Sequence, residues 1–165
     1  MRTSRIHKLI LAVALVAAAM ASSAAAGTTR QASIDTQLRV ALKATSKYAA
    51  GLALARHDGY RAVTQYVPGV GLEVMNPNLK GFDVRKPAVL IYEHRGSSWR
   101  LGAVEWVFPD KPARPPLAGA RYGNAGSGLV GMRVWLWAAN PNGLFASTNP
   151  AASYANPLVP ASVTD

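Results

Sequence analysis

The chain has 165 residues, no cysteine and a formal net charge of +10, from 18 Lys and Arg against 8 Asp and Glu. Its hydrophobic content of 50% is too high for an intrinsically disordered chain in which only 16% of residues are charged. The lack of cysteine excludes a disulfide framework, a zinc finger, an iron–sulfur cluster and a cysteine nucleophile, and the length suits about one domain.

The first 26 residues have the pattern of a secretory signal peptide. A basic start with Arg2, Arg5 and Lys8 precedes an apolar run over residues 9–20, and small residues follow up to Ala26. This order predicts export, with cleavage after Ala26. The alternative is an uncleaved membrane anchor, for which the apolar stretch is short and rich in alanine. Cleavage would remove three basic residues and leave a net charge of +7. We therefore expect the protein to be secreted, periplasmic or part of the cell envelope.

The segment after a short polar leader has helical periodicity. Apolar residues at steps of three and four predict one amphipathic helix over residues 33–56, which Asp58 and Gly59 would end. Residues 60–67 are expected to add a short helical turn before Pro68. The helix thus forms the N-terminal part of the expected domain.

From Gly69 onwards the hydrophobic pattern is typical of strands. Strands are predicted over residues 71–76, 88–95, 99–108 and 129–138, with a hairpin turn at residues 96–98. The proline-rich segment 109–116 and the glycine-rich segment 119–128 are predicted to be loops, and the tail from residue 151 is predicted to be disordered.

These elements predict a single α+β domain over residues 27–150. One long helix followed by about four antiparallel strands can bury its apolar faces if a curved sheet packs on the helix, in a cystatin-like or related roll. Sheet curvature would leave a concave face that the helix partly covers. We expect a binding site on that face.

Charged residues interrupt the apolar strand segments. They are Glu73, Glu93, Glu105 and Arg133. Alternation puts Glu93 on the side of Val89 and Ile91; it puts Glu105 with Leu101, Ala103 and Val107, and Arg133 with Trp135 and Trp137.

Two interpretations of these charges stay open. Each charge could mark the solvent face of a one-sided sheet. Alternatively, buried carboxylates need a partner, because an isolated buried charge is very costly, and Arg133 would supply it. Our hypothesis is a Glu73–Arg133 pair, with Glu93 or Glu105 nearby, beside Trp135 and Trp137.

Two stretches resemble a family of small secreted bacterial proteins of unknown function. They are AVLIYEHRGSSWRLGAVEWVFPD, residues 88–110, and RVWLWAANPNGLFASTNP, residues 133–150. The resemblance spans residues 45–150 and implies the fold and export, without an activity. Where family motifs would place two histidines, this chain has Glu73 and Arg133, and it lacks the cysteine pair that relatives carry. The resemblance thus implies that Glu73 and Arg133 are close, and it makes a metal site in this chain less expected.

The histidines add no metal site. His7 lies in the predicted signal peptide, and His57 lies near the predicted helix end, where a positive group is favourable. His94 and Glu93 are consecutive in a strand, so their side chains should point to opposite faces. We expect no cofactor and no bound metal.

The leading hypothesis for function is an exported small binding or structural protein. The candidate ligand-binding residues are Glu73, Glu93, Glu105, Arg133, Trp135 and Trp137, which would hold an unknown small ligand or envelope component. The alternative is a secreted enzyme that uses Glu93 or Glu105 as a general acid or base, which would need a pKa raised by burial.

Basic residues along the predicted helix form a second candidate surface. They include Arg39, Lys43 and Lys47. These residues could simply form the solvent-exposed face of the helix. Alternatively, they form a basic stripe that binds an anionic polymer or a lipid surface. Nucleic acid is not expected, because no binding motif is present.

Overall fold

The computed structural model describes residues 31–95 and 98–153. The predicted signal peptide, the middle of the predicted hairpin turn and residues 154–165 of the predicted tail lie outside the described residues. The chain divides into two compact units, Met1–Thr36 and Gln37–Asp165, and the second unit contains the whole sheet. None of the helices in the described part is long and apolar enough to cross a membrane.

The N-terminal helix is shorter than predicted. Residues 31–45 are α-helical, the 3-10 turn η1 (Ser46–Tyr48) follows, and a separate short helix, α2 (Ala53–His57), comes after a break. The break coincides with contacts to the sheet: the Tyr92 hydroxyl donates to the carbonyl oxygens of Tyr48 and Gly51, at 3.0 and 3.1 Å. The prediction of one helix over residues 33–56 is therefore wrong beyond η1, because the sheet takes up carbonyl groups that a continuing helix would use.

The segment after α2 is extended. Asp58 caps α2 and Gly59 follows with a φ of 93°, a conformation that favours glycine, so the predicted helix end is confirmed. The chain then forms β1 (Arg61–Ala62), which pairs with β2 (Leu72–Met75). The helical turn predicted for residues 60–67 is therefore wrong, because pairing with a neighbouring strand decides this segment.

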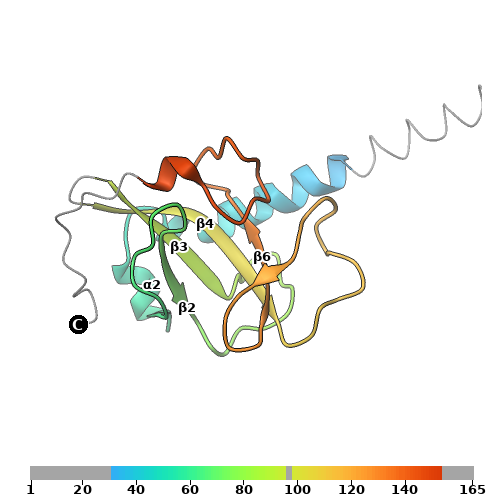
Figure 1. Ribbon diagram of the computed structural model, residues 1–165, viewed down its shortest axis with the longest axis horizontal. Coiled ribbons are helices and arrows are strands. Elements are labelled where there is room, and N and C mark those ends of the chain that lie inside the picture. Colours follow the sequence, from blue (N-terminus) through green and yellow to red (C-terminus); the bar gives the residue numbers. More distant parts are fainter. Residues whose placement is uncertain (1–30, 96–97, 154–165) are drawn as a thin grey trace, which may run out of the picture. The chain divides into compact units, whose positions relative to one another are not determined.

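In the described part of the chain the sheet has six strands, all antiparallel to their neighbours, in the order β1-β2-β3-β4-β6-β5. The others are β3 (Val89–Arg95), β4 (Ser98–Phe108), β5 (Gly123–Asn124) and β6 (Val130–Val134). Figure 1 shows β2, β3, β4 and β6 side by side. The predicted α+β class is confirmed. The sheet has more strands than the four predicted, since β1 and β5 have two residues each and β5 lies in a segment predicted as loop.

The two faces of the sheet are covered by different parts of the chain. Leu90, Val104 and Trp106 belong to a core that also includes Ala41 and Tyr48 of the helical segment. The strand residues that alternate with them belong to a second core: Val89, Ile91, Ala103 and Val107. Trp135, Ala138 and Ala152 of the C-terminal segment complete this second core. Both faces are therefore buried, which explains why charged residues could not be assigned to a solvent face.

One β-bulge changes the alternation in β4. Ile91 pairs with Ala103, but Tyr92 pairs with Leu101, so Gly102 is the extra residue. Leu101 consequently lies in the helix-side core. The prediction that Leu101 shares a face with Glu105 is wrong for this reason.

The last strand and the tail also differ from their predicted bounds. β6 ends at Val134, and the next residues turn, with the amides of Trp137 and Ala138 both donating to the Gly102 carbonyl. The chain then forms the 3-10 turn η2 (Pro150–Ser153), in which Ala152 is buried. Ordered structure thus continues past the predicted boundary at residue 150, because Ala152 joins the second core.

Candidate functional site

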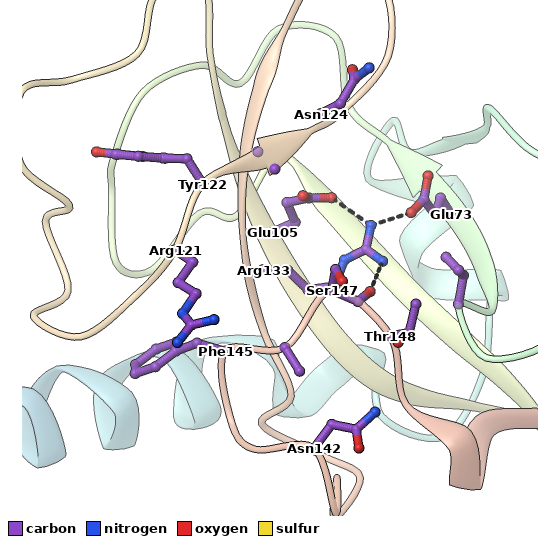
Figure 2. A pocket seen from close by; sticks show the side chains of 14 residues that line it. Glu73, Glu105, Arg121, Tyr122, Asn124, Arg133, Asn142, Phe145, Ser147 and Thr148 are labelled. Atoms are coloured by element: carbon purple, nitrogen blue, oxygen red, sulfur yellow. Dashed lines mark hydrogen bonds and ion pairs between the residues drawn. The ribbon is translucent and has the colours of Figure 1, made fainter.

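Three strands contribute to one ion-pair cluster. Glu73 comes from β2, Glu105 from β4 and Arg133 from β6, where Arg133 pairs directly with Glu105 in the ladder. The Arg133 Nη2 donates to Glu73 Oε1 and to Glu105 Oε2, the latter at 3.1 Å. Arg133 Nη1 donates to the Ser147 carbonyl oxygen at 2.9 Å. Figure 2 shows the guanidinium between both carboxylates and the Ser147 loop. The predicted Glu73–Arg133 pair with Glu105 nearby is confirmed.

The cluster is largely removed from water. The exposed fractions of the side chains are 12% for Arg133, 15% for Glu73 and 5% for Glu105. Burial raises the pKa of Glu105, the charge and hydrogen bond of Arg133 oppose this rise, and the charge of Glu73 adds to it. One guanidinium therefore serves two carboxylates, and burial outweighs its effect on the pKa of Glu105.

Two strand glycines make room for the glutamates, and sequence reasoning missed both. A Cβ at Gly131 of β6 would lie 2.0 Å from Glu105 Oε1, and a Cβ at Gly102 would lie 2.9 Å from Glu93 Cγ. Real Cβ atoms do not approach so closely, so a side chain at either position would force the glutamate to shift. The available signal was a glycine inside each predicted strand, which often marks a close approach.

A pocket of about 550 Å³ opens next to the cluster. Glu73, Glu105 and Arg133 line it together with residues from the loop around β5 and from the loop after β6. The first group is Arg121, Tyr122, Gly123 and Asn124, and the second is Asn142, Phe145, Ala146, Ser147 and Thr148. The volume is typical of sites for small molecules. Sequence reasoning missed these loop residues, because loops carry no periodic signal.

Side-chain hydrogen bonds hold the loop after β6 in its conformation. Trp135 Nε1 donates to the Ala146 carbonyl at 2.8 Å, and Asn140 Nδ2 donates to the Thr148 carbonyl at 2.9 Å. Asn149 Nδ2 donates to the Ala139 carbonyl at 3.0 Å. Together with the bond from Arg133 to Ser147, these contacts hold the pocket wall in place.

The remaining predicted site residues do not line the pocket. Glu93 is buried in β3, and Trp135 supports the wall from the second core. Trp137 lies on the other side, where its Nε1 donates to Thr45 Oγ1 at 3.0 Å. The prediction that Trp137 shares a face with Arg133 is wrong, because β6 ends at Val134 and the alternation stops there.

The face of the site also differs from the expectation. Glu105 lies between Val104 and Trp106, and both neighbours belong to the core that the helical segment joins. The cluster therefore occupies the opposite face, under the C-terminal loop. The helix does not cover the site, because the second face has its own cover from residues after β6.

Within the described residues, no group of three or more metal-ligating side chains is placed to hold an ion. His57 is exposed and pairs with Asp58 at 3.0 Å. His94 is buried and packs edge-on against Trp99, with ring centroids 4.8 Å apart. Neither histidine lines the pocket.

Fold and site together define an α+β domain with a two-sided antiparallel sheet and a pocket built around an arginine that two glutamates share. Comparisons with family models, with curated proteins and with solved structures find no match for this chain.

Proposed function

We propose that the protein is an exported binding protein whose pocket holds a small polar ligand. The observation that carries this proposal is the contact between the pocket and the Arg133 cluster. Two strand glutamates share one arginine, and all three side chains still line a cavity of about 550 Å³. A purely structural ion pair would be expected to be enclosed by packed side chains, with no cavity beside it. Here, polar groups from two loops surround an open space beside it.

Export rests on the N-terminal pattern of the sequence, and the ligand would accordingly be a solute or an envelope component outside the cytoplasm. The resemblance to small secreted bacterial proteins supports the same location. The relation to a cystatin-like roll is likewise proposed, on the order of one helix followed by antiparallel strands.

Binding is favoured over catalysis by the position of Arg133. A general acid or base needs a carboxyl that can exchange protons with a substrate. Both Glu73 and Glu105 instead accept hydrogen bonds from Arg133 Nη2. The arrangement therefore favours a fixed electrostatic framework.

The proposal is tested by native mass spectrometry of the protein recovered from the periplasm or medium of cells that express the full chain. We expect an additional mass that is lost on denaturation. Ser147→Trp should abolish it, since Ser147 is an exposed residue of the pocket wall. Gln65→Trp, at an exposed position away from the pocket, is the matched control. Equal ligand retention by both variants would contradict the proposal.

A second candidate function, general acid–base catalysis by Glu105, is favoured by one observation, the raised pKa of this buried carboxyl. The two functions differ in what the protein carries. A binding protein should retain the same compound in the wild type and in Glu105→Gln. An enzyme should carry product in the wild type and unreacted substrate in the variant.

A further inference from the structure

We propose that the ligand of this pocket is a sugar acid, a small polyhydroxylated carboxylate whose acid group binds Arg121. This inference rests on the proposed binding function and names the class of ligand. It follows from how the polar groups of the pocket are already used.

The two arginines of the pocket differ in their partners. Both terminal nitrogens of Arg133 are in use, by Glu73 and Glu105 at Nη2 and by the Ser147 carbonyl at Nη1, and its Nε is buried without a hydrogen-bond partner among the described residues. Arg121 is exposed and pairs with no carboxylate among the described residues. A guanidinium matches the geometry of a carboxylate with two parallel hydrogen bonds. Arg121 is therefore the cation that remains for an acidic ligand.

An aromatic ring lies on the same side of the pocket. Phe145 is half-buried, and its ring is 3.7 Å from the place that a Cβ at Gly119 would take, just before Arg121 in the chain. In Figure 2, Arg121 extends from its loop toward Phe145. Tyr122 is fixed nearby by its hydroxyl, which donates to the Arg114 carbonyl at 3.0 Å. Both rings pack partly against the helix-side core and also line the pocket, so they supply apolar surface at its wall for the apolar face of a sugar ring.

The rest of the pocket offers groups that match hydroxyls. Glu73 binds Arg133 through Oε1, and its Oε2 accepts no hydrogen bond from the described residues. The side chains of Asn142, Ser147 and Thr148 also line the pocket without a hydrogen bond to another described side chain. An ionised carboxylate is purely an acceptor, so Glu73 Oε2 is available to accept a hydrogen bond from a ligand hydroxyl.

The opposite charges of Glu73 and Arg121 exclude a ligand that is anionic throughout. Figure 2 places these two residues on opposite sides of the Arg133 head group. A second anionic group beside Glu73 would be repelled, since Arg133 is already shared between two carboxylates. A ligand with one acid group for Arg121 and hydroxyl groups for Glu73 matches the polar groups at both ends of the pocket. An amino acid could supply an ammonium to Glu73, but it would leave Asn142, Ser147 and Thr148 with fewer partners.

Isothermal titration calorimetry with matched sugars tests the inference. D-Galacturonate and D-glucuronate are compared with D-galactose and D-glucose, which differ from them only in having a hydroxymethyl group for the carboxylate, and glutamine represents the amino acids. We expect a uronate to bind at least about tenfold more tightly than its neutral counterpart, because hydrogen bonds to charged groups are the stronger ones. The uronate affinity should also fall as salt is added.

Arg121→Gln should weaken uronate binding about tenfold and leave binding of the neutral sugar unchanged. Arg114→Gln is the matched control, since Arg114 is exposed in a nearby loop and does not line the pocket. Equal binding of acid and neutral sugar, no effect of Arg121→Gln, or preference for glutamine would overturn the sugar acid. If native mass spectrometry shows a retained ligand without an acid group, the sugar acid fails and the binding function stands. If no compound is retained and none of the probes binds, the binding function itself fails.

Discussion

The carboxylate of Glu105 occupies the space that a side chain at Gly131 would fill. These residues lie on the neighbouring strands β4 and β6, and a Cβ at Gly131 would lie 2.0 Å from Glu105 Oε1 and 2.7 Å from its Cδ. The buried carboxylate therefore depends on a glycine in the adjacent strand. Both residues also line the pocket, so stability and site geometry are coupled here.

Gly131→Ala should destabilise the protein by about 1–3 kcal/mol, because the new methyl group forces Glu105 and the strand to move. Urea unfolding measures the change. Gly123→Ala in β5 is the control, since a Cβ there would meet nothing within 4 Å; it should change stability by less than about 0.5 kcal/mol. A second substitution, Glu105→Ala, should remove most of the extra cost of Gly131→Ala. Additive effects would contradict the steric explanation.

Arg133→Met should cost about 3–5 kcal/mol, because it leaves two largely buried carboxylates without their shared cation. It also frees the Ser147 carbonyl and should loosen the pocket wall. Glu73→Gln should cost less, since Arg133 keeps Glu105 and the Gln amide oxygen still accepts a hydrogen bond. Urea unfolding compares both variants with the wild type. An Arg133→Met variant as stable as Glu73→Gln would show that the cluster is not a shared ion pair.

The raised pKa of Glu105 predicts how stability depends on pH. In the folded state this carboxyl holds its proton to a higher pH than in the unfolded state, so its contribution to stability falls as pH rises from its ordinary value of 4.5 through its folded pKa. Glu105→Gln removes this dependence. The free energy of unfolding of both proteins is measured from about pH 4 to about pH 8. The wild type should lose stability relative to the variant as pH rises through the acidic part of this range. At higher pH the difference between the two proteins should stay constant. A difference that grows in favour of the wild type would reverse the sign and refute the assignment.

Asp58 should act with the opposite sign. The Lys47 hydrogen bond is the largest cause of its lowered pKa, and bonds from His57 and Tyr48 lower it further. Lys47 Nζ and the Tyr48 hydroxyl lie 2.5 and 2.8 Å from Asp58 Oδ2. The stabilisation is present above the ordinary Asp pKa and is lost as pH falls through the folded one. Asp58→Asn should be less stable than the wild type at neutral pH and should approach it in acid. Asp110→Asn, in the exposed loop after β4, should change stability at neutral pH much less.

Sequence reasoning succeeded where the signal was local. The positions of β2, β3 and β4 and the Asp58–Gly59 helix end were predicted correctly, because they depend on residues a few positions apart; the alternation within β4 was predicted only as far as the bulge. The Glu73–Arg133 pair could also be predicted, since a buried charge in a strand needs an opposite charge on the same face.

The helix break, β1, β5 and the side taken by Trp137 depended on distant partners. Tyr92 binds carbonyls at the end of η1, Met75 pairs with Arg61, and Thr45 accepts a hydrogen bond from Trp137. No periodic pattern records such partners, because each joins segments far apart in the chain.

The sequence by itself determined the α+β class and the need for a charge partner within the strands, since alternation and the cost of buried charge act on the residues alone. Only the tertiary structure decided that Glu105 shares Arg133 with Glu73, that Gly131 makes room for it, and that the loop after β6 completes a pocket lined by Arg121. These features arise where strands and loops meet, and their packing is set by the register and the bulge of the whole sheet.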